Sequence, residues 1–419
     1  MPHAAVRAQP QPVRLKRKRL EAYRRLIGDD AVAAIRDLAS ELRGARILEL
    51  SSTATGGGVA ELLSSLVPLQ RDVGLDVQWN LIPGDAAFFD FTKALHNGLQ
   101  GKTIAISAEN REEYLTHNAA YAASLGEGWD AVIVHDPQPA AVRSLAHIDD
   151  GTRWIWRCHI DSSTPDPTAI DFLRPYIERY DCAVFTLPEF VPPDLEVSAV
   201  FIKPAIDPLT SKNRELPAFL ARETVEELGI DLSRPLMIQV SRFDPWKDPL
   251  GVVEVWRLAR SAFPDLQLAL VGSMAGDDPE GWRIYQEVEA AVRDEPDCLL
   301  LTNQMGVTAH EVNALQRVTD VAVQKSIREG FGLVVSETLW KGTPIVAGRA
   351  GGITSQLEDG VSGRLASGVE EFASAVRELL ERPTAARELG SAGRRRVREE
   401  FLIPRLLRDQ LALLTDLLA

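Results

Sequence analysis

Short apolar runs alternate with amphipathic stretches along the first two hundred residues. The runs have the length of buried strands, and the stretches between them repeat apolar residues at helical spacing. Strands separated by helices form parallel βαβ units, because a parallel neighbour is reached only through a crossover connection. After helices at about Arg14–Ile27 and Asp30–Leu42, the pattern predicts strands at Ala45–Leu50, Leu75–Ile82, Ala131–His135, Trp154–Cys158, Ala183–Thr186 and Ala199–Lys203.

The alternation stops at Lys203–Pro208 and then starts again. Pro204 and Pro208 fix φ and block helix continuation, so this segment is expected to be an interdomain linker. A helical tail beyond about Arg395 could pack on either half. The second half predicts strands at Leu236–Val240, Leu266–Val271, Cys298–Leu301, Val321–Gln324 and Pro344–Ala347, with helices at Leu250–Phe263, Gly281–Arg293, Ala309–Arg317 and Gly332–Lys341 between them.

The pattern therefore indicates an α/β protein with two parallel-sheet halves, residues 1–206 and 207–400. Sheets of this kind bind ligands beyond the carboxyl ends of their strands. Two such halves that face each other would enclose a deep cleft, which is where we expect the ligand.

The overall composition excludes some functions. The chain has 419 residues, with 46 Lys and Arg against 60 Asp and Glu, a net charge of −14, and 45% hydrophobic residues. Nucleic acid needs clustered cations and is not expected as a partner. A small anionic ligand stays open, because a few local cations and backbone amides suffice to hold it. The basic run from Arg14 to Arg25 is interpreted as a solvated leading segment.

Membrane insertion and export are not expected either. No apolar run is long enough to cross a bilayer, and Met1–Gln11 lacks the apolar core of a signal peptide. We therefore predict a cytoplasmic protein. Cys158, Cys182 and Cys298 form no CxxC pair, so they are expected to be small buried hydrophobes, and no metal site is predicted.

Three loops that follow predicted strands carry candidate ligand-binding residues. The first contains Gly56, Gly57 and Gly58 where a predicted helix begins. Glycines let the backbone approach a ligand closely, and a helix N-terminus offers free N–H groups to an anion. The spacing matches neither GxGxxG nor a Walker A motif, so a tight structural turn explains this loop equally well.

The second loop carries Arg242 and Lys247 directly after the predicted strand Leu236–Val240. Two cations at the carboxyl end of a strand can together neutralise a diphosphate, a task for which many enzymes use a metal ion. Solvated loop charges are the alternative interpretation for this loop considered alone.

The third loop follows the strand Val321–Gln324 and carries Glu329 and Glu337, with the glycine-containing stretch Gly330–Leu333 after the first glutamate. Its amides can contact sugar hydroxyls and phosphate, and the helix that begins there adds its positive end. The two carboxylates can accept hydrogen bonds from different sets of hydroxyls. Helix capping is the alternative role for either one.

Together these loops resemble the retaining glycosyltransferases of family 4. Glu329–Leu333 with Glu337 resembles that family's donor-site signature, and Arg242 with Lys247 resembles its diphosphate clamp. The resemblance implies the GT-B fold, in which two Rossmann-like parallel-sheet domains face a central cleft. It also implies that the last helix, about residues 401–419, packs back on the N-terminal, mainly acceptor-binding domain, whereas the C-terminal domain binds the donor.

Longer strings, Phe88–Gly101, His135–Pro139 and Arg157–Ser163, are similar to the trehalose glycosyltransferring synthases of that family. Those enzymes join the glucosyl group of a nucleoside diphosphate glucose to free glucose, and give trehalose in one reversible step. The resemblance thus implies a retaining hexosyltransferase. Trehalose phosphorylases share much of this sequence, so phosphorolysis is an alternative, as is another family 4 transferase with a different acceptor.

The resemblance also implies a mechanism. The departing phosphate oxygen would take the proton from the acceptor hydroxyl in a front-face attack, so Glu329 would position glucose rather than attack it. Phe88, Phe89 and Phe91 could flank the acceptor or belong to the core. The implied catalytic residues are Arg242, Lys247, Glu329 and His159, the donor-binding residues are Gly57, Gly58, Gly330, Phe331, Gly332, Leu333 and Glu337, and the acceptor-binding residues are Asp85, Lys93, Asn97 and Asp136.

No tightly bound cofactor is implied. The donor would be ADP-, UDP- or GDP-glucose, and Mg²⁺ is considered only as a companion of the nucleotide. A homodimer is expected. A non-catalytic sugar-nucleotide-binding protein and a sugar-nucleotide epimerase are the alternatives from other classes, but the clamp and both glutamates, which a decayed site typically loses, are all present.

Overall fold

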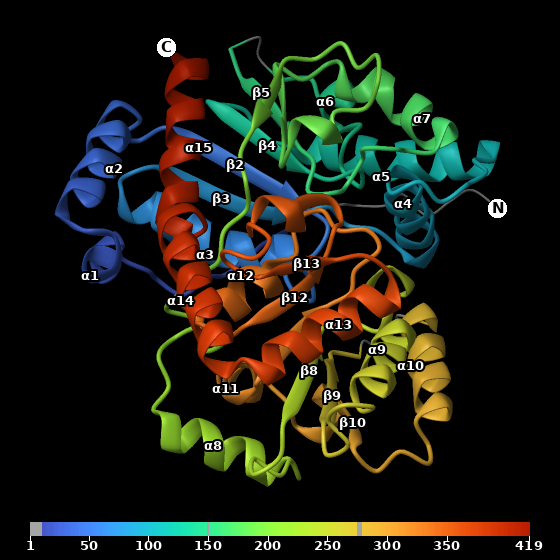
Figure 1. The fold of residues 1–419 in the computed structure, drawn as a ribbon. Coiled ribbons are helices and arrows are strands. Elements are labelled where there is room, and N and C mark those ends of the chain that lie inside the picture. Colours follow the sequence, from blue (N-terminus) through green and yellow to red (C-terminus); the bar gives the residue numbers. More distant parts are fainter. Residues whose placement is uncertain (1–10, 149–150, 275–278) are drawn as a thin grey trace. The chain divides into compact units, whose positions relative to one another are not determined.

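The computed structural model describes residues 11–148, 151–274 and 279–419 (Figure 1). The chain separates into an N-terminal unit, Met1–Ala205 with Ile403–Ala419, and a C-terminal unit, Ile206–Leu402. These divisions fall within a few residues of the expected ones at 206 and about 400. Residues 1–10, on which most of the signal-peptide prediction rests, lie outside the described part.

The N-terminal unit is built on one sheet with the strand order β1-β3-β2-β4-β5-β6-β7, parallel except for β1. The strands are β1 (Gln11–Pro12), β2 (Arg46–Ser51), β3 (Asp76–Leu81), β4 (Ala131–His135), β5 (Arg153–Arg157), β6 (Cys182–Phe185) and β7 (Ala199–Phe201). The helices are α1 (Arg24–Ile27), α2 (Asp29–Glu41), α3 (Gly58–Asp72), α4 (Ala86–Leu99), α5 (Ala108–Ser124), α6 (Val142–Leu145), α7 (Pro167–Ile177) and α15 (Ile403–Leu418).

Both faces of this sheet are buried, which explains the continuous apolar runs. Successive residues of β2 point to opposite faces, so Ile47 joins a core with residues of α2, α3 and α15, whereas Leu48 and Leu50 join a second core with residues of α4, α5 and α7. The helices between parallel strands therefore cover both faces, as a doubly wound sheet requires.

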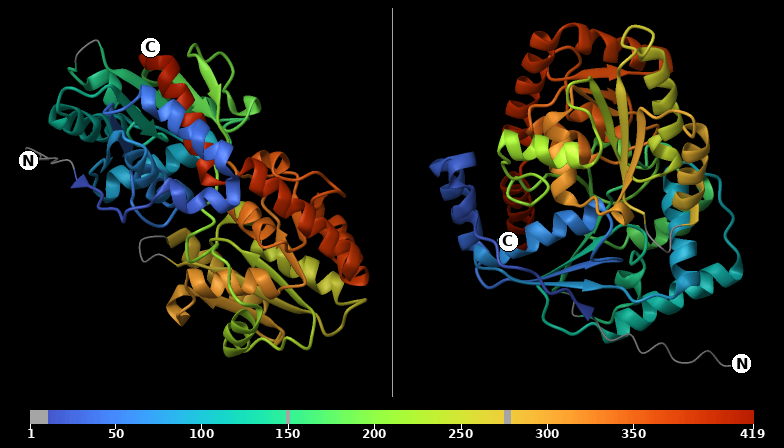
Figure 2. Two further views of the ribbon diagram at one scale, coloured as in Figure 1. Left: turned by 90° about the vertical axis from the view of Figure 1, so that its left-hand side faces the viewer. Right: turned by 90° about the horizontal axis from the view of Figure 1, so that it is seen from below.

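The C-terminal helix α15 belongs to the first of these cores. Leu407 and Leu411 are fully buried there, and α15 lies beside α2 and α3 (Figures 1 and 2). Arg405 near its start donates to the backbone oxygens of Lys203 (2.7 Å) and Pro204 (2.8 Å). The last helix thus completes the N-terminal unit, the arrangement expected from the resemblance.

The C-terminal unit has a six-stranded parallel sheet in the order β10-β9-β8-β11-β12-β13. Its strands are β8 (Leu236–Val240), β9 (Gln267–Gly272), β10 (Cys298–Thr302), β11 (Val321–Gln324), β12 (Ile345–Gly348) and β13 (Arg364–Ala366). Its helices are α8 (Ala218–Glu227), α9 (Pro249–Ala259), α10 (Pro279–Ala291), α11 (Ala309–Val318), α12 (Leu333–Trp340), α13 (Gly368–Glu381) and α14 (Pro383–Glu400).

The predicted helix Arg14–Ile27 is wrong over its first part. Residues 13–19 form no helix, and a 3-10 turn at Leu20–Tyr23 precedes α1. Leu20 donates its backbone N–H to Asp72 (2.8 Å), and Lys18 donates to Ser65 (3.0 Å). These tertiary contacts with α3 hold the segment extended, which overrides its local helix propensity.

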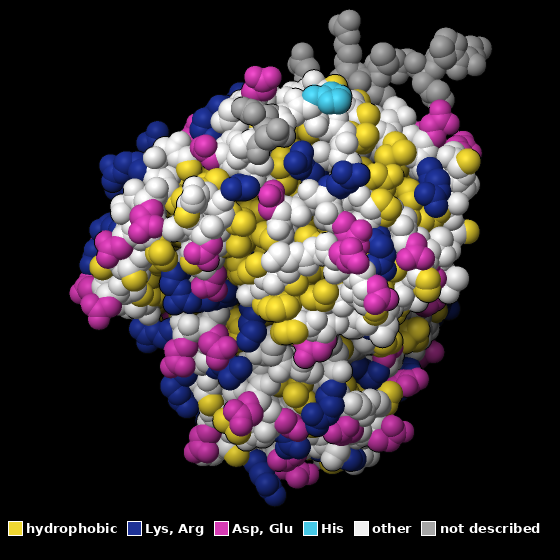
Figure 3. Space-filling model, turned by 90° about the horizontal axis from the view of Figure 1, so that it is seen from above, with side chains coloured by type: hydrophobic (Ala, Val, Ile, Leu, Met, Phe, Trp, Pro, Cys, Tyr) yellow, Lys and Arg dark blue, Asp and Glu magenta, His cyan; other side chains and the backbone are white. Residues whose placement is uncertain are grey.

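The short strands β1 and β13 were not predicted, and Cys298 is only half-buried, whereas Cys158 and Cys182 are buried as expected. Figure 3 shows Lys and Arg side chains interspersed with Asp and Glu around an apolar area on one face of the molecule. A membrane-spanning helix was not expected from the sequence. Within the described residues, no helix is both long enough and apolar enough to span a membrane.

Candidate active site

The C-terminal unit carries its candidate residues where the strand order reverses. From β8 the chain proceeds to β9 and β10 on one side, then returns to β11 and continues to β12 and β13 on the other. β8 and β11 are therefore neighbours at the topological switch point, the usual ligand position in such sheets. The loops that follow these two strands hold Arg242, Lys247 and Glu329.

Lys247 and Glu329 meet between these loops. Lys247 ends the 3-10 turn Pro245–Lys247, and its Nζ contacts Oε2 of Glu329. Ser326 donates to the same carboxylate oxygen (3.1 Å). Gln239 joins both loops, because it donates to the backbone oxygen of Lys247 (3.0 Å) and accepts from the backbone N–H of Lys325 (2.9 Å). The pair is thus placed by strand order and by a buried amide.

Arg242 lies on the same loop and is more exposed. Its guanidinium is 3.1 Å from Asp244, and 54% of its side chain is accessible. Asp244 also accepts from the backbone N–H of Trp246 (2.8 Å) and thereby caps the turn Pro245–Lys247. Both cations therefore have carboxylate partners that a bound diphosphate could replace.

The stretch Gly330–Leu333 is held rigidly at the start of α12. Gly332 caps this helix with φ +81°, a conformation that favours glycine. Gly352 donates its N–H to the backbone oxygen of Glu329 (3.0 Å), and a Cβ on Gly352 would lie 2.4 Å from the oxygen of Gly330. Phe331 is buried against Phe401, with 5.6 Å between ring centroids. Phe331 therefore anchors the loop, whereas the helix start supplies the amides.

Glu337 is fully buried on α12, and its Oε1 lies 3.0 Å from Nζ of Lys212. Lys212 precedes α8 and was not predicted as a site residue, since a lone lysine in a polar loop carries no sequence signal. A buried carboxylate requires such a partner.

In the N-terminal unit, the switch point lies between β2 and β4. The glycine loop follows β2: Gly56 has φ +81°, and Gly57 caps α3 in an extended conformation with φ −158°. A Cβ on Gly57 would meet nothing within 4 Å. Neither backbone strain nor packing therefore requires glycine at 57, which favours close approach of a ligand as its reason.

His159 and Asp136 come together at the ends of β5 and β4. Asp136 has φ +63° and accepts the backbone N–H of His159 (2.8 Å). Burial raises the pKa of Asp136 to about 6. Burial, with the nearby Arg157 charge, holds the pKa of His159 well below 6.5, so this ring is neutral at pH 7. Nε2 of His159 lies 2.9 Å from Nδ1 of His135.

The remaining predicted acceptor residues lie on and before α4. Asp85 caps this helix by accepting from the N–H of Phe88 (3.0 Å), while Lys93 is exposed and Asn97 half-buried one turn apart. Phe88 and Phe91 are core residues, 0% and 5% exposed, so their predicted alternative role beside the acceptor is wrong. Phe89 is 38% exposed.

Comparison with known proteins identifies the family. Residues 49–192 match the model of the trehalose synthase N-terminal domain, and residues 221–396 match glycosyl transferases group 1. A trehalose synthase of Rubrobacter xylanophilus is 50% identical over 96% of this chain and 97% of its own length. The chain belongs to the trehalose synthase family of glycosyltransferases. Membership makes it a trehalose-forming hexosyltransferase with the GT-B fold.

Other members and neighbours extend this comparison. A trehalose synthase of Pyrococcus horikoshii is 42% identical over 96% of this chain and 97% of its own length. A trehalose phosphorylase of Pleurotus pulmonarius is 29% identical over 83% of this chain but only 54% of its own. The solved UDP-forming trehalose-phosphate synthase of Burkholderia xenovorans shares the fold, with a TM-score of 0.70 at 16% identity over 89% of this chain and 99% of its own.

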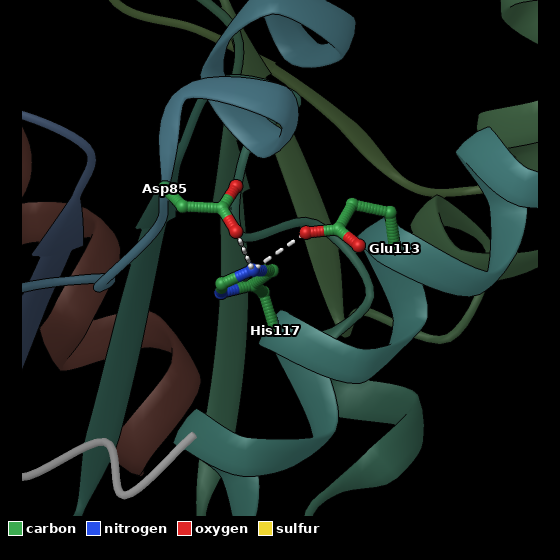
Figure 4. Close-up of side chains that lie close together, drawn as sticks. All are labelled: Asp85, Glu113 and His117. Atoms are coloured by element: carbon green, nitrogen blue, oxygen red, sulfur yellow. Dashed lines mark hydrogen bonds and ion pairs between the residues drawn. The ribbon is translucent and has the colours of Figure 1, made fainter. Parts of the chain in front are cut away.

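One polar cluster of this trehalose synthase family member was not predicted. Asp85, Glu113 and His117 come together between the start of α4 and α5 (Figure 4). Nε2 of His117 lies 2.9 Å from Glu113 and 3.7 Å from Asp85, and its Nδ1 lies 3.2 Å from the oxygen of Pro83. The cap bond from Phe88, and to a lesser extent the charge of His117, lower the pKa of Asp85.

Ligand atoms of these three side chains lie within 4.8 Å of one another, a spacing that could hold a cation. His117 and Glu113 are already hydrogen-bonded to each other, and Asp85 lies at ion-pair distance from the same ring nitrogen, so these side chains have partners without a cation. The sequence signal was the spacing of Glu113 and His117, which places both on one face of α5.

Proposed function

We propose that the protein transfers a glucosyl group from a nucleoside diphosphate glucose to free glucose, reversibly and with retention of configuration. The observation that carries this proposal is the contact between Lys247 and Glu329 at the switch point of the C-terminal unit. A cation and a carboxylate held side by side offer suitable partners for the two parts of one donor. The cation suits its phosphates, and the carboxylate suits the hydroxyls of its sugar.

The cations act on the leaving group. As the glycosidic bond breaks, negative charge develops on the departing phosphate, and fixed cations stabilise this charge without reorganising. Arg242 and Lys247 are positioned on one short loop by Asp244 and Gln239. The N-terminus of α12 adds backbone N–H groups of the same sign.

Glu329 acts as a binding group in this mechanism. One of its carboxylate oxygens already contacts Lys247 and Ser326, which suits a residue that accepts hydrogen bonds better than a nucleophile. The departing phosphate oxygen would take the proton of the attacking hydroxyl on the same face, so that the α configuration is kept. Glu337 would bind the ribose hydroxyls, and His159 and Asp136 would contact the sugars from the N-terminal unit.

The proposal includes no cofactor of the protein's own, and Mg²⁺ would enter with the nucleotide. The donor loops contain the cations Arg242 and Lys247, which can take over the charge neutralisation that a metal supplies elsewhere. Chelation with EDTA should therefore leave nucleotide binding largely intact. The homodimer and the cytoplasmic location stay predictions, which light scattering and cell fractionation test.

A panel assay tests the proposed reaction. ADP-, UDP- and GDP-glucose are each incubated with glucose, glucose 6-phosphate or fructose, and the product is identified by nuclear magnetic resonance. We expect α,α-trehalose from glucose with at least one donor, and formation of the nucleotide sugar from trehalose and nucleoside diphosphate. Trehalose cleavage that depends on inorganic phosphate would instead identify a phosphorylase.

Two further outcomes would overturn parts of the proposal. A covalent glycosyl adduct on Glu329, detected by mass spectrometry after incubation with a fluorinated donor, would replace the front-face route by a two-step one. Epimerisation of donor incubated alone would place the protein among sugar-nucleotide epimerases.

A further inference from the structure

Glu49 is a carboxylate in the middle of the central strand β2, 0% exposed between apolar neighbours. Such a group is retained only where hydrogen bonds replace its hydration. Oε1 accepts from the side-chain amides of Gln70 on α3 (3.2 Å) and Gln410 on α15 (2.8 Å). Oε2 lies 2.8 Å from Nε2 of His135 on β4. Three elements of the N-terminal unit therefore converge on this side chain.

The chain of contacts continues outward to the candidate site. His135 is 1% exposed, and its Nδ1 lies 2.9 Å from Nε2 of His159. The two rings are nearly parallel, at 16° with centroids 5.2 Å apart. His159, the last residue in this series of contacts, is half-buried. Glu49, His135 and His159 thus form one hydrogen-bonded line from the core of the sheet to its ligand-binding edge.

The proton positions follow from what each group can donate. An ionised carboxylate accepts only, so Nε2 of His135 must carry a hydrogen. A neutral imidazole has one N–H, which leaves Nδ1 of His135 as an acceptor for the Nε2 hydrogen of His159. His159 is then left with a lone pair on Nδ1. Each step fixes the tautomer of the next ring, as carboxylates do behind metal-binding histidines.

A buried cation also interacts with Glu49 in this line of residues. Arg157 is buried beside the line, and burial lowers its pKa to about 10 while the Glu49 charge counteracts that effect. Arg405, Asp136 and Asp409 also act on Arg157. Arg157 therefore already supplies a positive charge that interacts with Glu49, and the assignment takes His135 as a neutral ring.

We propose that Glu49 and His135 are positioning residues that present His159 to the substrate as a hydrogen-bond acceptor. Its partner would be a sugar hydroxyl that donates, which on the proposed function belongs to glucose or to the glucosyl group. Gln410 gives α15 a part in the same line, since its amide orients the carboxylate of Glu49.

Nitrogen-15 spectra of the wild-type protein labelled on histidine test the tautomers directly and need no substrate. We expect Nε2 of His159 to be protonated and Nδ1 to show the shift of an unprotonated ring nitrogen, with His135 in the same tautomer. Protonation of His159 at Nδ1, or of both nitrogens of His135, would overturn the proposal whatever the enzymatic activity.

The substitution Glu49→Gln reverses the direction of each hydrogen bond along the line and keeps the size and shape of the side chain. The amide can donate to Nε2 of His135, so both rings should switch tautomer and His159 should present an N–H. We expect kcat for trehalose formation to fall on the order of ten- to hundredfold, because an acceptor facing a hydroxyl becomes a competing donor. Melting temperature and nucleotide binding should stay close to wild type. Unchanged tautomers with unchanged kcat would contradict the proposed line.

Glu113→Gln is the matched control for the spectra. Glu113 also lies 2.9 Å from a histidine in the same unit, so this change should move the resonances of His117 and leave those of His135 and His159 in place. Movement of all three would show a general structural effect and overturn the assignment. If no donor yields trehalose with the wild-type protein, the proposed function fails, whereas the tautomer result stands separately.

Discussion

The two units place different chemistry at the same topological position. In the C-terminal unit, the loops after β8 and β11 carry Arg242, Lys247 and Glu329, which are charged and at least partly exposed. In the N-terminal unit, β2 and β4 at the switch point carry the buried Glu49 and His135, which form a line with the half-buried, neutral His159 after β5. The C-terminal unit thus offers charges to a ligand, whereas the N-terminal unit offers a neutral hydrogen-bonding group with a fixed orientation.

This difference follows from where desolvation can be tolerated. Charged partners of a diphosphate must exchange one anion for another, so they belong on loops where solvent and ligand reach them. A group that only has to accept a hydrogen bond from the ligand can be neutral, and buried hydrogen-bond partners fix its orientation best. The fold supplies both environments, because loops lie at the sheet edge and strands lie in the core.

Loss of a cation should have the largest effect. Lys247→Ala and Arg242→Ala should each lower kcat on the order of 10²-fold or more, because each removes fixed positive charge from the departing phosphate. Initial rates at saturating donor measure this effect. Arg222→Ala on α8 is the control, since its side chain is equally exposed, at 54%, but lies away from these loops in the sequence. Near-normal kcat in both cation variants would contradict the role of Arg242 and Lys247 as charges that act on the departing phosphate.

The second largest effect should come from the buried carboxylate Asp136, which should make the stability of the folded protein depend on pH. Its folded pKa of about 6 lies above the ordinary 3.8, so the folded state binds the proton more tightly and stability falls as pH rises from about 4 to about 6. The upper bound for this loss is about 3 kcal/mol, since each pKa unit corresponds to about 1.4 kcal/mol.

Asp136→Asn should remove this loss. Asparagine keeps the neutral form and tolerates the positive φ of this position. Its melting temperature should exceed that of the wild type above pH 6, and the gain should vanish near pH 4. A constant difference at every pH would show that Asp136 is ionised with little cost in the folded protein.

Two glycines sharpen the comparison further, with smaller effects. Gly57→Ala should leave the melting temperature unchanged and raise KM for the donor about tenfold, because its Cβ meets no protein atom but would crowd a ligand. Gly98→Ala on α4 should do the opposite. Its Cβ would lie 2.8 Å from Ala169, so overpacking should cost about 1–3 kcal/mol with KM unchanged. Equal KM values for Gly57→Ala and wild type would contradict close approach of a ligand to Gly57 and favour the interpretation of this loop as a structural turn.

The strands beside the ligand positions were the best predicted elements. β4, β8 and β11 begin and end as expected, because both faces of each are buried and the apolar run stops where the sheet stops. β1 and β13 were missed because two or three residues carry too little pattern. The leading helix was predicted wrongly, since contacts of Leu20 and Lys18 with α3 decide the conformation there.

The candidate site was predicted in its loops but not in its buried partners. Arg242, Lys247 and Glu329 follow strands directly and belong to recognisable strings. Lys212 and Glu49 belong to no string: one is a loop lysine that pairs with Glu337, and the other is a single carboxylate within an apolar strand. Their partners are distant in sequence, and no local pattern reports such a pair.

The sequence by itself determined the two α/β units, the parallel strands joined by helices, and which loops carry cations and carboxylates. These properties depend on periodicity and on residues adjacent to strand ends, which are local. Only the tertiary structure decided that Lys247 contacts Glu329, that Phe88 and Phe91 belong to the core, and that Gln410 from the last helix reaches Glu49. Those contacts join residues separated by up to 361 positions, and burial at that range is set by packing rather than by pattern.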